Sequence, residues 1–466
     1  MKEILIKLSV LFLVIITTMC STDYNEMIRD SETVFYNGNH KEAARKLISY
    51  INDEGKEQLL LLMECGMMLH VSGEYETSNR VFLKAAKIAD TISTSITKQT
   101  AALLLNETMT NYKGEDFERV LVHMYLGINF LMLNNFESAR VEFKKVDELL
   151  RDINVTTGKK YKQNILAKYL TAIAFELVAD IDQDENDREF AYIEYKQIHK
   201  LSPKLSFVHR DLQRLSKQLG DMEDYNKWKA KFGKKYRLNK NTGELIVIYH
   251  AGRGAVKVSR GSLLSDVSMK NGISASFSGM PLKSGVTLVG VLLALKIAEH
   301  PIPKFKKRSN NITHLVVNIN GKDSGRTYML ENIENTAVKN MEDNYKRMYL
   351  KVAAGISVKA IASVSAALIA KKIAEQTNGG KGFAGIVGAI VGLGTGAALA
   401  SQIKPDLRCW HTLPANMQIG RIFLSPGKYN VTIKFMNKKS GVEKTEETSI
   451  EIAKGKKTFL NYRTLN

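Results

Sequence analysis

Residues 66–85, GMMLHVSGEYETSNRVFLKA, contain two amphipathic segments with a turn between them. Gly66 lies in the first segment and Gly73 at the turn, while Phe82 and Ala85 lie in the second. Small residues allow two helices to touch closely, and the large residues fill the groove between neighbouring helix pairs. The full pattern over 59–90 therefore predicts an antiparallel helix pair, with signature positions Gly66, Leu69, Gly73, Tyr75, Phe82 and Ala85.

The same pattern recurs along the first half of the chain. It returns over 119–149 at Gly127, Phe130, Phe136, Ala139 and Phe143. Partial matches lie at Gly38, Ala43, Ala191, Tyr195 and Pro203. Gly38 and Gly73 are 35 residues apart, close to the period of about 34 in tetratricopeptide repeats. Residues 26–235 thus resemble a tetratricopeptide-repeat (TPR) solenoid, with one irregular connection at 91–115.

A solenoid of this kind has a concave face, and two roles for it remain open. It binds a protein partner, or it is a scaffold that holds the flanking domains. The acidic stretch DQDEND at 182–187 lacks the loop glycine and the closing glutamate of a calcium-binding EF-hand. We predict a solvated turn there and no metal site.

The composition is that of a basic globular protein. The chain has 466 residues, 44% of them hydrophobic and 25% charged, and a formal net charge of +19. Lysine bias without a target, attraction to anionic lipid or cell-wall polymers, and nucleic-acid binding would each produce such a charge. Basic residues are dispersed, and no nucleic-acid recognition motif is present, so we predict no nucleic-acid partner.

The N-terminus indicates export. Lys2 and Lys7 precede an apolar run over 8–16, which is too short for a membrane span of about 20 residues. We predict a signal peptide at 1–19, lipidation of Cys20 and a tether at 20–25. The alternatives are an ordinary secretory signal or an uncleaved anchor. Ser21 favours the outer membrane, with the protein facing the periplasm.

The remaining cysteines, Cys65 and Cys409, lie in different predicted domains, so a disulfide between them is not expected. No Cys-x-x-Cys pair is present, so the sequence gives no support for a zinc or redox site.

The second half changes to the period of strands. GELIVIYHAGRGAVKVS (243–259) predicts two strands joined by a hairpin turn at its glycines, and THLVVNING (313–321) predicts a strand before a turn. The end of the chain predicts four antiparallel strands. The fold class is therefore α+β: a TPR-like α-solenoid, then a small β-sandwich or sheet domain formed by 240–331 and 404–466.

A helical insertion at 332–403 interrupts the strands. Its segment 382–403 has 22 residues without a charge and places Gly388, Gly392 and Gly396 on one helical face. Such a face allows close helix contact. We predict an Ala/Gly-rich helical hairpin packed within the protein, and the alternative is membrane insertion or self-association. The apolar stretch 284–300 predicts a core helix or strand.

Three stretches, 112–146, 243–258 and 406–433, together resemble a family of uncharacterised bacterial TPR lipoproteins of the cell envelope. The most specific is the last, with Arg408, Trp410, Leu413, Pro414, Arg421 and Gly427. The resemblance implies an exported, membrane-tethered protein without an assigned activity. Relatives occur with other envelope lipoproteins, including activators of peptidoglycan synthases, which suggests an envelope protein as the partner.

The sequence predicts a non-enzymatic adaptor or scaffold without a cofactor. A membrane-active or self-assembling protein is the alternative, and a hydrolase is the least supported. Gly-x-Ser-x-Gly and His-Glu-x-x-His are absent. Cys409 and His411 lie on either side of Trp410 in the sequence. Residues this close on an extended chain point to opposite sides or are separated by one position, so the pair is a weak indication of a nucleophile and base. Cys409 is expected to pack as a small hydrophobic residue.

Overall fold

A computed structural model describes residues 24–52, 54–96, 110–157, 164–182, 184–233, 241–271, 298–345, 348–349, 352, 369–372 and 403–465. The signal peptide, Cys20, the irregular connection at 97–109, the glycine face at Gly388, Gly392 and Gly396, and most of 284–300 lie outside the described residues. Those predictions are therefore not addressed by the fold.

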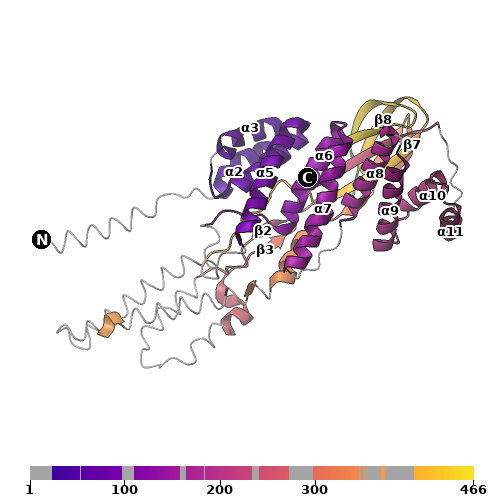
Figure 1. The fold of residues 1–466 in the computed structure, drawn as a ribbon. Coiled ribbons are helices and arrows are strands. Elements are labelled where there is room, and N and C mark those ends of the chain that lie inside the picture. The colour runs from indigo at the N-terminus through magenta and orange to yellow at the C-terminus, as the bar shows by residue number, and fades with distance from the viewer. Residues whose placement is uncertain are drawn as a thin grey trace.

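The first half consists of helices that pair in chain order (Figure 1). The pairs are α2 (Tyr24–Tyr36) with α3 (His40–Ile51), α4 (Gln58–Val71) with α5 (Tyr75–Ile96), α6 (Asp116–Met132) with α7 (Phe136–Thr157), α8 (Ile165–Asp182) with α9 (Glu185–Leu201), and α10 (Val208–Gln218) with α11 (Met222–Phe232).

The signature residues lie where the helices of a pair touch. A Cβ atom added to Gly66 would lie 2.6 Å from the Phe82 ring, and one added to Gly127 would lie 2.4 Å from the Phe143 ring. Each glycine therefore accommodates an aromatic ring of the second helix. Ala85 and Ala139 are fully buried. Tyr75 and Phe136 are the first residues of α5 and α7.

Gly73 ends α4 with a φ of +81°, a left-handed conformation that glycine adopts without steric cost. Its N–H donates to the His70 carbonyl, and the next N–H, of Glu74, donates to the Leu69 carbonyl. Gly38 and Asn134 have positive φ at the equivalent turns after α2 and α6. The repeat is thus visible in the backbone as well as in the sequence.

The second half contains β1 (Gly243–Ala251), β2 (Val256–Val258), β3 (Lys304–Lys306), β4 (Ile312–Ile319), β5 (Lys322–Arg326), β6 (Tyr328–Glu331), β7 (Asn416–Leu424), β8 (Gly427–Asn437), β9 (Val442–Ile452) and β10 (Lys457–Arg463). In the described residues they form two four-stranded sheets, of order β10-β1-β7-β6 and β5-β4-β8-β9, and a two-stranded sheet of β2 and β3.

The two larger sheets pack face to face. Leu245, Val247 and Tyr249 of β1 share a core with residues of β4, β8 and β9, whereas Ile246 and Ile248 belong to the core formed with the helices. The sheet that contains β1 is therefore the middle layer, between the other sheet and the solenoid. Every residue of β1 is buried, as expected for a strand that is covered on both faces. The α+β class predicted from the sequence is confirmed.

Two details of the predicted strands were wrong. β2 does not form a hairpin with β1; it pairs antiparallel with β3, and Gly252, in the connection after β1, has a φ of +62°. The last four strands are also not a simple antiparallel set. β8 and β9 pair antiparallel, but β10 pairs parallel to β1, on the opposite edge from β7.

Residues 333–345 are helical after β6, and the described part of the chain contains no helix long and apolar enough to cross a membrane.

Candidate functional site at the helix–strand interface

The middle sheet covers one face of the solenoid, here called the first-helix face because α2, α4, α6 and α8, the first helices of their pairs, supply most of it. Residues 59–70 of α4 are all buried, and α6 and α8 are buried on nearly every side. Each of these helices packs against the second helix of its own pair. Each also contacts the second half of the chain, residues 241–465, here called the strand half. A helix that is apolar all round is typical of such a position.

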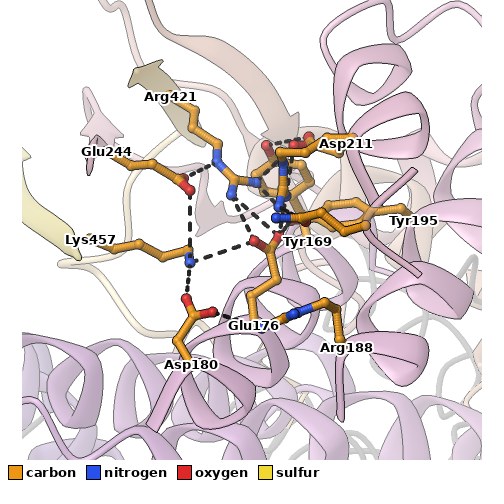
Figure 2. Close-up of polar contacts among 11 residues, drawn as sticks. Tyr169, Glu176, Asp180, Arg188, Tyr195, Asp211, Glu244, Arg421 and Lys457 are labelled. Atoms are coloured by element: carbon orange, nitrogen blue, oxygen red, sulfur yellow. Dashed lines mark hydrogen bonds and ion pairs between the residues drawn. The ribbon is translucent and has the colours of Figure 1, made fainter. Parts of the chain in front are cut away.

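One end of this interface is a buried cluster of charges, the Arg421 cluster (Figure 2). The Arg421 Nε atom of β7 lies 2.6 Å from Glu244 Oε2 of β1. Its Nη1 lies 3.0 Å from Asp211 Oδ1 of α10, and its Nη2 lies 3.2 Å from Glu176 Oε2 of α8. A single guanidinium therefore joins two helices to the middle sheet.

Further cations complete the Arg421 cluster. Lys457 Nζ of β10 lies 3.5 Å from Glu176 Oε2 and 3.1 Å from Asp180 Oδ2, and Arg214 Nη2 lies 2.6 Å from Glu176 Oε1. Arg188 pairs with Asp180. The hydroxyl groups of Tyr195 and Tyr169 donate to Glu176 and Asp211, respectively. The carboxylates Glu176, Asp180, Asp211 and Glu244 thus face the cations Arg188, Arg214, Arg421 and Lys457.

Burial and neighbouring cations shift the pKa values of these acids in opposite directions. Burial alone would raise the pKa of Glu176, but Arg214, Arg421 and Lys457 hold it well below its ordinary value. Arg421 and Lys457 likewise lower the pKa of Glu244 against the effect of burial. For Asp211 burial prevails and raises the pKa. Because the carboxylates are matched by cations and hydrogen bonds, the cluster acts as a structural junction.

At the other end, segment 406–414, which turns at His411 and Thr412, lies against α4 and α6. The N–H of Trp410 donates to Glu118 Oε1 at 2.7 Å, and the N–H of His411 donates to Glu64 Oε1 at 2.6 Å. Thr412 donates to Glu64 through both its N–H and its hydroxyl. Helix carboxylates thus bind the backbone of this segment much as they would bind a separate peptide.

Two side chains anchor segment 406–414. Arg408 Nη1 lies 3.1 Å from Glu57 Oε2, and its Nη2 lies 2.7 Å from Asp406 Oδ2. The Trp410 ring is 1% exposed, and its centroid lies 5.8 Å from that of Phe82 and 5.9 Å from that of Tyr125. Phe82 thus contacts Gly66 on one side and the strand half on the other.

The centre of the interface is a neutral hydrogen-bonded chain. Asn461 of β10 donates to His70 Nε2 at 3.1 Å and lies 2.8 Å from His250 Nε2. His70 Nδ1 lies 2.6 Å from Asn129 Oδ1. Burial lowers the pKa of His70 to about 4, and burial, together with His70 and Arg463, lowers that of His250 well below its usual range. Both rings are therefore neutral near pH 7 and serve as fixed hydrogen-bonding groups.

Five of the six family-like positions gather at this interface, although the sequence assigned them no role. Arg408, Trp410 and Arg421 make the contacts given above. Leu413 and Pro414 are buried, and the Leu413 carbonyl accepts from the N–H of Gly254 at 2.7 Å. Gly427 is the exception: it is exposed and begins β8 of the outer sheet, with a φ of +154°.

Cys409 and His411, which the sequence made only a weak candidate pair, do contact each other through their side chains. Burial alone would lower the pKa of His411, but the Cys409 sulfur and the Glu32 carboxylate raise it well above its usual range. Cys409 is nevertheless 1% exposed, and its sulfur accepts the N–H of Lys257. A nucleophile buried in this way is not accessible to a substrate.

The carboxylates that hold the strand half were missed. Glu64, Glu118 and Glu176 are buried acids within the otherwise apolar helices α4, α6 and α8. The sequence feature that could have indicated this interface is the apolar composition on every face of these helices, which predicts that each helix is buried on all sides. It does not reveal which segment provides that cover.

Comparison with solved structures gives partial likenesses. The structure of MamA residues 41–end from Desulfovibrio magneticus RS-1 is 16% identical, with a TM-score of 0.31, and the match covers 46% of this chain and 96% of that one. A second structure, of a tetratricopeptide repeat protein from Parabacteroides merdae ATCC 43184, is 15% identical, with a TM-score of 0.21, and the match covers 47% of this chain and 81% of that one. No protein-family model matches the sequence, and neither does any curated protein.

Glu118 provides a test of the buried carboxylates by pH. Burial, followed by the charge of Glu115, raises its pKa from 4.5 to about 7. The folded state thus binds a proton more tightly than the unfolded state, so stability falls as the pH rises from about 4.5 to about 7. Between about pH 5 and pH 8 we expect the free energy of unfolding to fall by up to about 3 kcal/mol more in wild type than in Glu118→Gln. Urea unfolding at each pH measures this difference.

The matched control is Glu148→Gln on α7, because Glu148 is exposed. Its pH profile should follow that of wild type. Parallel profiles for Glu118→Gln and wild type would show that Glu118 does not titrate in this window.

Proposed function

We propose that the protein is a non-enzymatic scaffold of the bacterial cell envelope, held on a membrane by lipid at Cys20 and facing the periplasm. The observation that carries the scaffold role is that the chain's own strand half covers the first-helix face. Its repeats hold segment 406–414 and the middle sheet in place through Glu57, Glu64, Glu118 and Glu176. A protein partner therefore binds a surface of the combined unit, not the first-helix face.

The same observation supports a role without catalysis. The acids Glu176 and Glu244 are paired with Arg421, and Cys409, a nucleophile present at the interface, is buried. Such groups fix the relative position of two regions. The tether and the envelope location follow from the export signal and from the resemblance to envelope lipoproteins.

The tether is tested by the variant Cys20→Ala. With several acyl chains on Cys20, we expect wild type to enter the detergent phase in a phase-partitioning experiment and Cys20→Ala to stay in the aqueous phase. Cys65→Ala, which leaves the proposed lipid attachment intact, is the control. Equal partitioning of wild type and Cys20→Ala would contradict the lipid anchor.

The scaffold role is tested by chemical cross-linking of the full chain in envelopes. We expect a stoichiometric protein partner that solubilised wild type and Cys20→Ala both retain, because binding belongs to the folded unit. The helical half alone is unsuitable for this experiment, because without the strands it exposes the first-helix face, which is buried in the full chain. Failure of both full-length proteins to retain any stoichiometric partner would contradict the role.

A further inference from the structure

Strand β9 forms an open edge of the outer sheet, which is the sheet of order β5-β4-β8-β9. The strand has 11 residues, about 37 Å at about 3.4 Å per residue, and it pairs along one side with β8. Within the described residues no strand pairs with its other side. An edge of this length presents unpaired N–H and C=O groups to solvent, which is a template for a further strand.

The backbone groups of alternate β9 residues point to this open edge. In β8 the C=O of Asn430 accepts from the N–H of Asn320, and its N–H donates to the side chain of Asn320, so both groups point to β4. Ser449 lies opposite Asn430, and in such an antiparallel pair its own backbone groups point away from β8. The register is unbroken over 444–452, so Thr445 and Glu447 have the same orientation as Ser449.

The open part of the edge covers residues 445–449. At its end the Glu451 carbonyl accepts the hydroxyl of Thr458 from β10 at 3.2 Å. At its start the register shifts, and Glu443 has no residue opposite it in β8. No proline interrupts residues 444–452, so every residue of the open part keeps its N–H.

The outward side chains of β9 give this edge a negative charge. They are exposed and include no base: Thr445, Glu447, Ser449 and Glu451. Glu451 lies opposite Lys428 of β8, whereas Glu447 lies opposite the neutral Thr432. Opposite charges on neighbouring strands contribute about 0.2–1 kcal/mol per pair, and like charges are unfavourable. The edge therefore favours a strand with bases on this face. A second copy of β9 would bring only acids there.

We propose that β9 pairs along residues 445–449 with an extended basic segment of a protein partner, which adds one strand to the outer sheet. The inference rests on the proposed scaffold function and specifies where the partner binds. Main-chain hydrogen bonds hold the segment, and a lysine or arginine beside Glu447 selects it. The intervening side chains extend the inward face, on which Ile450 belongs to the core between the sheets, so β-branched residues suit those positions.

The binding test uses the full chain and a fluorescent peptide of about seven residues that alternates lysine and valine. A second peptide has glutamate in place of each lysine. A third keeps the lysine sequence but has an N-methylated backbone, which retains the charge and removes the N–H donors. We expect the lysine peptide to bind in fluorescence polarisation. The other two peptides should bind at least about tenfold more weakly, because each lacks one of the two interactions.

Three variants place the binding on β9. Glu447→Lys should weaken binding of the lysine peptide about tenfold and strengthen binding of the glutamate peptide. Thr445→Pro removes an N–H that points to the open edge and leaves the pairing with β8 in place, so it should weaken binding about tenfold as well. Glu148→Lys makes the same charge change at an exposed position of α7 and should leave binding unchanged. Circular dichroism verifies that each variant is folded.

Several results would overturn the proposal: no binding of the lysine peptide, equal binding of the glutamate or the N-methylated peptide, or affinity that Glu447→Lys does not change. A wild-type dimer that Thr445→Pro abolishes would assign the edge to a second copy instead. In the cross-linking experiment, an envelope partner that wild type retains and Glu447→Lys loses supports the proposal. A partner that both retain contradicts binding at β9 while the scaffold function stands.

Discussion

Arg421→Met is expected to lower the free energy of unfolding by about 3–5 kcal/mol, because it leaves buried carboxylates without their shared cation. Arg421 contacts Glu176, Asp211 and Glu244 from three different elements, and its side chain is 5% exposed. Burial in a medium of low polarity makes an uncompensated charge far more costly than the original ion pairs were favourable. Urea unfolding followed by circular dichroism measures the loss.

A matched control and a rescue make this result specific. Arg151→Met removes an exposed arginine and should change stability by no more than about 0.5 kcal/mol. Adding Glu244→Gln to Arg421→Met removes one of the uncompensated carboxylates, so the double variant should be more stable than Arg421→Met alone. Strictly additive losses would mean that Arg421 and Glu244 do not act as a pair, contrary to their 2.6 Å contact.

The pKa values of the acids in the Arg421 cluster determine how the stability lost in Arg421→Met depends on pH. Glu176 and Glu244 have lowered pKa values in the fold, so their contribution is present above their ordinary pKa and is lost as the pH falls through the folded value. In Arg421→Met the same acids are deprived of a cation, and protonation relieves them. The difference in stability between wild type and Arg421→Met should therefore shrink as the solution becomes more acidic.

The repeats were predictable from the sequence because their signature is local. Gly66 and Phe82 lie in consecutive helices of one pair, so spacing alone brings them together. The hairpin between β4 and β5 was equally local: Asn320 and Gly321 adopt φ values of 49° and 86°, as a tight hairpin turn requires.

The interface was not predictable because its partners are distant in sequence. Arg421 and Glu176 are 245 residues apart, and nothing in a single sequence links them. The parallel pairing of β1 with β10 also joins the two ends of the strand half. What the sequence did contain was the apolar composition of α4 and α8, which indicates burial on all sides but not the identity of the covering segment.

Trp410→Ala should lower the free energy of unfolding by about 3–5 kcal/mol, because it removes a large ring from the contact with Phe82 and Tyr125. Trp410→Phe keeps an aromatic ring there and should cost less. Thermal unfolding followed by circular dichroism measures both. Trp228 is the other tryptophan in the chain, so a Trp228→Phe background makes fluorescence report on Trp410 alone.

The decisive comparison is between Trp410 fluorescence, which reports on the interface, and circular dichroism, which reports on the helices. Trp410 contacts α5 and α6, and Arg421 contacts α8 and α10, so the two substitutions affect opposite ends of one interface. If the helices and strands form a single cooperative unit, Trp410 fluorescence and the helical signal change together, with one midpoint. A solenoid that stays helical after the Trp410 signal is lost would be stable without its strands. In that case the strand half could separate from the helices, and the first-helix face could bind a separate protein partner.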